Sequence, residues 1–242
     1  MSNSSNFLEA IRDAKRGTLV GPNVIAKALP YLGAGLVLTA VGTYGGLGVL
    51  STNPGLFMPT FWVALIAEFV LYFVAFNVAQ KGNNNVALPL LALYSLLSGY
   101  TLSGLVFYAL ASVGMRAIAI AALGCGVTFV VARQIGSNLS DEDGFALTRT
   151  VQLGIIALVV VIGAQLLFSF FGVYTPAWLE IGISGIGVLL FVGAAVVDFY
   201  ILPRTYRDEQ YLPAALSMYL TYINLFIFIL RLVIILSGGS RD

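Results

Sequence analysis

The sequence contains no histidine and a single cysteine, Cys125, among its 242 residues. Without histidine the chain cannot build a Ser-His-Asp or Cys-His catalytic site, and it cannot sense pH through an imidazole. One cysteine cannot form a disulfide within the chain, and zinc sites usually use clusters of cysteine and histidine. Any response to pH near neutrality must therefore come from carboxylates in an unusual environment.

Charged residues are also scarce. Only 10% of the chain is Asp, Glu, Lys or Arg, 59% is hydrophobic, and the formal net charge is +1. Soluble domains carry about 25% charged residues, so this chain has too few charges to cover a surface that faces water. The near-zero net charge gives no indication of nucleic acid binding. The composition predicts an integral membrane protein.

Seven apolar runs account for most of the chain, and each is long enough to cross a bilayer as a helix of about 20 residues. The runs cover residues 28–50, 59–78, 86–111, 116–132, 151–171, 178–202 and 214–236. None alternates with a period of two, as the strands of an outer-membrane barrel do. We therefore expect an all-α protein with an N-terminal segment at 1–27, a transmembrane domain at 28–236 and a short tail at 237–242. Residues 6–15 are predicted to form a short helix at the membrane surface.

The basic residues are distributed unevenly between the two sides of the predicted bundle. The N-terminal segment and the even-numbered connections contain Arg12, Lys15, Arg16, Lys27, Lys81, Arg133, Arg149, Arg204 and Arg207. The opposite connections contain only Arg116. Because cytoplasmic loops carry an excess of Lys and Arg, the N-terminus is predicted to be cytoplasmic.

Three charged residues fall inside the apolar runs, where a charge costs about 2.5–3.5 kcal/mol on insertion scales and is a functional candidate. Glu68 lies about 12 Å into the second run; the structural alternative is a protonated acid bonded inside the bundle. Asp198 lies late in the sixth run, where it could instead cap a helix or pair with Arg204. Arg231, in the seventh run, could neutralise a carboxylate or extend to the outer surface.

Other residues have sufficient structural explanations. Gly42 and Gly46 form a GxxxG pair, and a second stripe of small residues at four-residue spacing predicts close helix packing; this stripe consists of Ser95, Gly99 and Ser103. Ser140 with Asp143 resembles a helix capping box. The acidic cluster 141–143 does not form a calcium loop, because Gln152 stands where the closing Glu is required. Aromatic residues near run ends can anchor the protein at the interface; these are Tyr31, Trp62 and Trp178.

The last run resembles a known family. The segments 215–220 (Ala-Leu-Ser-Met-Tyr-Leu), 223–226 (Ile-Asn-Leu-Phe) and 230–231 (Leu-Arg) are similar to the C-terminal signature of the Bax inhibitor family. The positions of Asp198 and Glu68 agree with acidic positions in that family, and Ser98 to Thr101 resembles its small-residue segment. The resemblance extends over about 28–236 and is most specific in the last helix.

The resemblance implies a bundle in which six helices surround a central C-terminal helix, and a passive, pH-linked calcium leak. It also implies a pair of acids joining the last two helices on the cytoplasmic side. This chain departs from the pattern, because Thr221 stands where the second acid is expected. A basic residue expected late in the second helix is likewise missing at Ala79 and Gln80. Thr221 can hydrogen-bond to Asp198, but it cannot share a proton with it as a second acid would.

These observations give an expected function, a calcium-permeable and pH-sensitive leak channel. Calcium prefers oxygen ligands. Asp198 is expected to be the cytoplasmic-side ligand and gate, Glu68 a deeper calcium ligand, and Thr221 and Asn224 neutral oxygen donors. Arg231 is expected to be a structural residue or a counter-charge. The expected location is a bacterial plasma membrane, with the endoplasmic reticulum as the alternative implied by the family.

Other classes of function remain to be weighed. The alternative to a channel is a non-conducting scaffold that regulates other membrane proteins, such as a membrane protease or a stress response. A retinal protein would need a lysine in the last helix, but the lysines are Lys15, Lys27 and Lys81. We therefore expect no enzyme activity and no cofactor. The expected partners are the lipid bilayer and calcium, without nucleic acid, and a protein partner remains open.

Overall fold

Seven long α-helices make up the bundle in the computed structural model, which describes residues 19–172 and 175–238. All seven are long and apolar enough to cross a membrane. In chain order they are α2 (Val24–Thr52), α3 (Pro54–Gln80), α4 (Asn84–Ser112), α5 (Met115–Gly136), α6 (Asp141–Phe170), α7 (Ala177–Thr205) and α8 (Tyr211–Gly238). The prediction of an all-α protein with seven transmembrane helices is confirmed.

The helices extend beyond the apolar runs in several places. α2 already begins at Val24, inside the predicted N-terminal segment 1–27, and α8 continues to Gly238. The polar stretch 133–149 is mostly helical, because α5 ends at Gly136 and α6 starts at Asp141. Helical turns that protrude from the hydrocarbon can carry charged side chains while their backbone remains hydrogen-bonded. The helix predicted at 6–15 and the tail 239–242 lie outside the described residues.

Short connections keep neighbouring helices antiparallel and adjacent. Asn53 alone separates α2 from α3, and Pro54 occupies the start of α3, where its missing N–H costs no helical hydrogen bond. Gly114, between α4 and α5, has φ 87°, a left-handed conformation that glycine adopts without a steric penalty.

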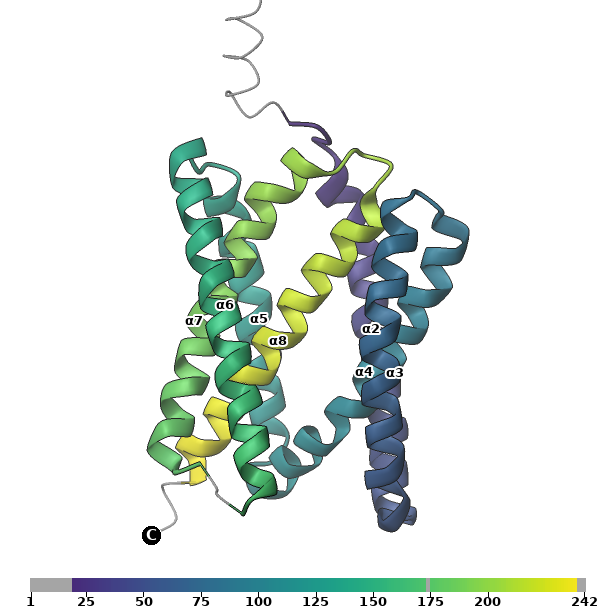
Figure 1. The fold of residues 1–242 in the computed structure, drawn as a ribbon, viewed down its shortest axis with the longest axis vertical. Helices are drawn as coiled ribbons and strands as arrows, with labels where there is room; N and C mark the ends of the chain where they lie inside the picture. Colours follow the sequence, from purple (N-terminus) through teal and green to yellow (C-terminus); the bar gives the residue numbers. More distant parts are fainter. Residues whose placement is uncertain (1–18, 173–174, 239–242) are drawn as a thin grey trace, which may run out of the picture.

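Six of the helices form two groups of three, and α8 lies between these groups (Figure 1). α2 and α3 both pack against α4, whereas α5 and α6 both pack against α7. α8 contacts α2, α3, α4, α5 and α7. Tyr219, Leu216 and Leu225 of α8 are among the largest fully buried side chains. The central position of the last helix, which the family resemblance implied, is confirmed.

Small residues bring α2 and α4 into close backbone contact. A Cβ atom added at Gly42 would overlap the carbonyl group of Leu96, and one at Gly99 would overlap the carbonyl group of Thr39. Thr43 donates a hydrogen bond of 3.0 Å to the carbonyl of Gly99 across the same interface. The close packing predicted from the two small-residue stripes is therefore present in the structure.

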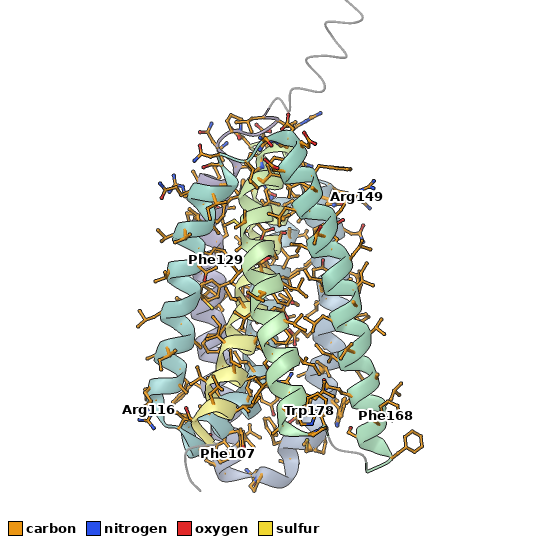
Figure 2. The ribbon with its side chains drawn as sticks, turned by 90° about the vertical axis from the view of Figure 1, so that its left-hand side faces the viewer. Phe107, Arg116, Phe129, Arg149, Phe168 and Trp178 are labelled. Atoms are coloured by element: carbon orange, nitrogen blue, oxygen red, sulfur yellow. The ribbon has the colours of Figure 1, made fainter. Side chains whose placement is uncertain are left out.

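Large apolar side chains cover the outside of the bundle, as they do where lipid is the solvent. Leu189 and Val130 are examples, each 72% exposed. Figure 2 shows Arg149 toward one end of the bundle, and Arg116, Phe168 and Trp178 toward the other. Tyr31 is not simply an interfacial anchor, because its ring stacks on that of Tyr211 at 4.9 Å.

Candidate functional site

Asp198 is a buried carboxylate in the second half of α7, and its side chain faces α8. The residue is 5% exposed. Its Oδ1 accepts a hydrogen bond of 2.9 Å from Ser217, and its Oδ2 accepts one of 2.6 Å from Thr221. Ser217 and Thr221 are four residues apart, so both hydroxyls lie on one face of α8. The hydrogen bond that the sequence allowed between Thr221 and Asp198 is thus present.

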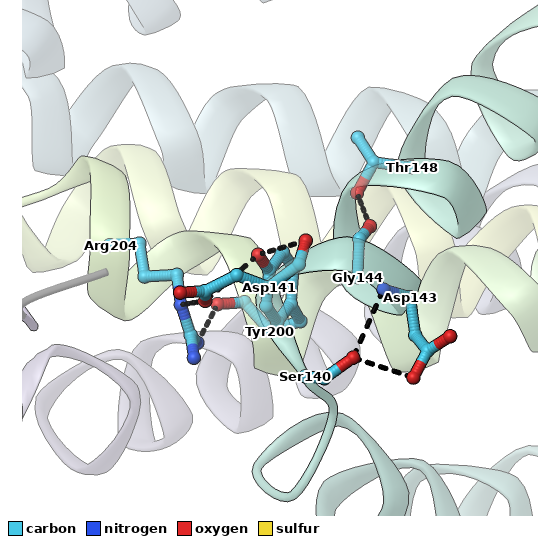
Figure 3. Close-up of polar contacts among 7 residues, drawn as sticks. All are labelled: Ser140, Asp141, Asp143, Gly144, Thr148, Tyr200 and Arg204. Carbon is cyan, nitrogen blue, oxygen red and sulfur yellow. Dashed lines mark hydrogen bonds and ion pairs between the residues drawn. The ribbon is translucent and has the colours of Figure 1, made fainter. Parts of the chain in front are cut away.

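Arg204 does not pair with Asp198, which was one structural alternative at the sequence level. Its Nε lies 3.6 Å from Oδ1 of Asp141, and its guanidinium lies over the ring of Tyr200 at 4.1 Å (Figure 3). Arg204 also donates a 2.7 Å hydrogen bond to the carbonyl of Tyr200, four residues earlier in α7. These contacts join the end of α7 to the start of α6. Asp198 instead accepts its hydrogen bonds from hydroxyl groups of α8.

The start of α6 is built around a helix cap. The Ser140 hydroxyl accepts a 3.1 Å hydrogen bond from the Asp143 backbone N–H, and it donates one of 2.6 Å to the Asp143 carboxylate (Figure 3). The helix cap predicted at Ser140 is confirmed, but the Asp143 carboxylate binds the Ser140 hydroxyl and not the backbone N–H that a capping box uses. A Cβ at Gly144 would overlap the ring of Tyr200, so this glycine lets α6 and α7 approach closely.

Glu68 lies on α3 and faces α4, away from Asp198. Its Oε2 accepts a 2.8 Å hydrogen bond from the hydroxyl of Thr101. The side chain of Ser98, on the same helix as Thr101, lies beside the Glu68 carboxyl group and also beside the hydroxyl of Tyr219. The side chain of Ser98 therefore lies between Glu68 and Tyr219 of α8.

Tyr219 is a site residue that the sequence analysis missed. Its hydroxyl lies 2.6 Å from that of Thr39 on α2, and its ring meets the ring of Tyr94 on α4 edge-on at 5.7 Å. Thr39 also donates to the carbonyls of Gly35 and Ser95. Tyr219 belongs to the segment that resembles the family signature, but no spacing rule distinguishes it from a core aromatic residue.

Asp198 contacts one side of α8, and Tyr219 on the opposite side contacts α2 and α4. Tyr219 stands two residues from both Ser217 and Thr221, which is about 200° around a helix of 3.6 residues per turn. One face of α8 is thus bound to Asp198 of α7, and the other faces the hydroxyl cluster that leads to Glu68. Within residues 19–172 and 175–238, no group of three or more His, Cys, Asp or Glu side chains could hold a metal ion.

Neither carboxylate has a cationic partner among the residues that the structure describes. The ion pairs found in the described part of the chain join Lys27 to Asp208 and Arg204 to Asp141. Isolated charges inside a bundle are costly unless they are paired, hydrogen-bonded or protonated. Within residues 19–172 and 175–238, the side chains that bind Asp198 and Glu68 carry hydroxyl groups and no positive charge.

The two remaining predicted site residues lie elsewhere. The side-chain amide of Asn224 donates a 2.8 Å hydrogen bond to the carbonyl of Leu220 in its own helix. Arg231 lines a cavity near the end of α8 together with Glu180, and it pairs with neither Asp198 nor Glu68. Asp198 and Thr221 are thus in direct contact, whereas Glu68 and Arg231 are not part of that contact.

A second polar contact near the start of α2 was also not expected from the sequence. The backbone and side-chain amides of Asn23 donate to Asp208 at 2.9 and 3.0 Å, and Lys27 lies 3.9 Å from the same carboxylate. The Asn23 hydrogen bonds, with the Lys27 charge, hold the pKa of Asp208 below its usual range. The backbone N–H groups of Val20 and Gly21 donate to the carbonyl of Pro203. Together these bonds fasten the chain before α2 to the connection between α7 and α8.

Comparison with known proteins identifies the family. Residues 21–239 match the family model described as inhibitor of apoptosis-promoting Bax1. An uncharacterised protein of Deinococcus radiodurans is 31% identical over 229 residues, which covers 90% of each chain. An uncharacterised membrane protein of Streptococcus pyogenes serotype M1 is 30% identical over 86% of this chain and 90% of its own. Bax inhibitor 1 of Schizosaccharomyces pombe is 32% identical over 73 residues, 30% of this chain and 27% of its own. The chain is therefore a seven-helix membrane protein that belongs to the Bax inhibitor family.

Proposed function

We propose that this protein is a passive leak pathway for calcium ions, with Asp198 at its gate. The observation that carries the proposal is a carboxylate 5% exposed that faces the central helix and has no cationic partner in residues 19–172 and 175–238. A buried anion without a counter-charge attracts a cation or a proton, and calcium prefers oxygen ligands. Carboxylate and hydroxyl oxygens from Asp198, Ser217 and Thr221 converge at this point.

The proposed gate is the contact between α7 and α8. The ionised carboxylate of Asp198 accepts hydrogen bonds from two hydroxyls of α8, so it holds that helix against α7. A calcium ion that binds the carboxylate, or a proton that neutralises it, competes with these hydrogen bonds. Because α8 also contacts the α2–α4 side of the bundle, releasing it from α7 would change the packing between the two groups of helices.

Glu68 is proposed as a second point of cation attraction on the other side of α8. It is half-buried and held by Thr101. The basic residues near the N-terminal end favour a cytoplasmic position of this end by the positive-inside rule, and in the proposed orientation Asp198 lies toward the cytoplasmic side. The proposed location is a bacterial plasma membrane, in line with the bacterial relatives.

Calcium entry into liposomes tests the proposal. The purified full chain is reconstituted, and entry is measured from about pH 6 to pH 8 for the native protein and for Asp198→Asn. Asparagine keeps the shape but carries no charge and does not titrate in this range. We expect calcium entry above that of empty liposomes in the native protein, and a changed rate of entry that no longer depends on pH in Asp198→Asn.

Glu142→Gln is the matched control, since it removes an exposed carboxylate from the start of α6, away from the contact between Asp198 and α8. It should leave both the rate and its pH dependence unchanged. Equal leakage from native and protein-free liposomes at every pH would refute the channel, as would identical behaviour of Asp198→Asn and the native protein.

A non-conducting scaffold is the second candidate, and a specific observation favours it. Thr221 replaces the acid expected there, and its hydroxyl with that of Ser217 already satisfies both oxygens of Asp198. In a scaffold, such a site locks α7 to α8. For a scaffold, Asp198→Asn lowers the thermal stability while calcium entry stays at the level of empty liposomes.

A further inference from the structure

A polar cavity lies between α6, α7 and α8, near the end of the bundle away from Asp198. Its volume is about 420 Å³. Gln165 and Ser169 of α6, Thr175 from the following connection, Glu180 of α7 and Arg231 of α8 contribute its polar lining. Gln165 donates a 2.9 Å hydrogen bond to Thr175, which fixes one wall of the cavity. None of these residues takes part in the contact between Asp198 and α8.

Two opposite charges face this cavity without pairing. Within the part of the chain that the structure describes, the side chains of Glu180 and Arg231 form no ion pair and no hydrogen bond. Both residues are half-buried. On an open surface, two unpaired charged side chains would simply be solvated by bulk water. Here an acid of α7 and a base of α8 line the same cavity.

The cavity lies at the depth where lipid headgroups are expected. Glu180 belongs to the first turn of α7, and Arg231 lies seven residues, or about 10 Å, before the end of α8. Trp178, 72% exposed, and Phe168 lie toward the same end of the bundle (Figure 2). Exposed aromatic residues at the end of a transmembrane bundle mark the boundary between hydrocarbon and water.

The charges select the chemistry of a ligand. An arginine matches the geometry of a phosphate group, and a carboxylate accepts hydrogen bonds from a primary ammonium group. A molecule that carries both groups a few bonds apart, at this depth in a membrane, is a phospholipid with an ethanolamine headgroup. Basic pockets between transmembrane helices are known as headgroup sites. The acid beside the base would add selectivity for a zwitterionic lipid.

We propose that the cavity between α6, α7 and α8 binds the headgroup of phosphatidylethanolamine, with its phosphate on Arg231 and its ammonium group on Glu180. The occupant is a lipid of the surrounding bilayer. Gln165, Ser169 and Thr175 offer further polar groups to the phosphate and glycerol oxygens. This inference is independent of calcium permeation.

Lipid binding to the purified full chain in detergent tests the proposal. Phosphatidylethanolamine, phosphatidylcholine and phosphatidylglycerol with identical acyl chains are added, and bound lipids are counted by native mass spectrometry. We expect the ethanolamine lipid to bind most tightly. Phosphatidylcholine cannot donate a hydrogen bond to Glu180, and phosphatidylglycerol has no cationic group. Losing one charge-assisted hydrogen bond should weaken binding about tenfold or more.

Two variants and a control distinguish the contact with the ammonium group from the contact with the phosphate. Glu180→Gln should remove the preference for ethanolamine over glycerol headgroups, because it no longer attracts the ammonium group. Arg231→Gln should weaken the binding of all three lipids, since all carry the phosphate. Arg116→Gln is the matched control, because it removes a positive charge from the same end of the bundle outside the cavity and should change nothing.

The outcomes that overturn the proposal are clear. They are equal binding of the three lipids to the native protein, or Arg231→Gln behaving like Arg116→Gln. If a variant fails to fold, the native protein alone decides the question with ethanolamine lipids that carry one, two or three N-methyl groups. Affinity should decrease as methyl groups replace the N–H donors, and an unchanged affinity along the series would refute the contact with Glu180.

Discussion

At the scale of single residues, hydroxyl groups take the place of charged partners. Asp198 is held by Ser217 and Thr221, and Glu68 by Thr101. A hydroxyl group donates one hydrogen bond without neutralising the acid, which is what the proposed attraction of a cation requires. A second acid at position 221 would instead share a proton with Asp198 and titrate as a coupled pair. Replacing that acid with Thr221 makes Asp198 the sole titratable group in this contact.

The hydroxyl of Tyr219 provides a prediction at this scale. Tyr219→Phe removes the contact with Thr39 but keeps the ring that packs on Tyr94. Thr39 still donates to the carbonyls of Gly35 and Ser95, so no buried donor is left without a partner. We expect the free energy of unfolding in detergent to fall by about 0.5–1.5 kcal/mol.

Tyr108→Phe is the control for this measurement, because Tyr108 lies on α4 with its side chain 60% exposed. Its hydroxyl group should contribute little to stability. If thermal or denaturant unfolding shows the same small change for both substitutions, the hydroxyl cluster around Tyr219 does not hold α8 in place.

At the scale of helices, the interface between α2 and α4 depends on residues without a large side chain. Gly42 and Gly99 lie against the carbonyl groups of the facing helix, and Thr39 and Thr43 donate hydrogen bonds to α4 across the interface. Lipid chains are as apolar as leucine, so association in a bilayer depends on close packing and on such bonds. The interface positions Thr39 for its contact with Tyr219.

Gly99→Ala tests this packing. Its added methyl group would meet the backbone of Thr39, which cannot move aside as a flexible side chain can. Overpacking of this kind costs about 1–3 kcal/mol, and it should lower the thermal stability measured in detergent. Gly45→Ala in α2 is the matched control, because nothing lies within 4 Å of its added Cβ. Equal stability of the two variants would show that α2 and α4 are not closely packed.

At the scale of the whole molecule, the described chain starts and ends at opposite ends of the bundle, as seven crossings require (Figure 1). Asn53 connects α2 to α3 at one end, and Asn138 lies between α5 and α6 at the other. α8 separates two groups of three helices and has polar contacts with both, through Asp198 on α7 and Thr39 on α2. A change in either contact would therefore alter how α8 packs against both groups of helices.

The orientation predicted from the basic residues can be tested by labelling. A cysteine is introduced at Asn138 or at Asn53, both exposed, while the native Cys125 is buried. With the N-terminal end in the cytoplasm, a membrane-impermeant maleimide should label Asn53→Cys in intact cells. It should label Asn138→Cys only after the cells are opened. The reverse result would contradict the orientation and place Asp198 toward the outside.

Composition and hydropathy by themselves determined the class of the protein. Too few charges and seven long apolar runs leave a helical membrane protein as the physically reasonable fold, because helices satisfy their own backbone in lipid. The small-residue stripes and the cap at Ser140 were equally local signals, and their contacts formed as expected. Other helix ends were less well predicted, since α2 already begins at Val24 and α8 continues to Gly238.

Only the tertiary structure decided which polar groups meet. The sequence did not indicate that Arg204 pairs with Asp141. It also did not show that Asp198 has its hydrogen-bond partners on α8. It gave no indication that Tyr219 would reach Thr39, 180 residues away, or that Glu180 and Arg231 would line one cavity. Such contacts depend on the rotation and tilt of each helix, which the packing of all seven determines together. No single segment contains that information.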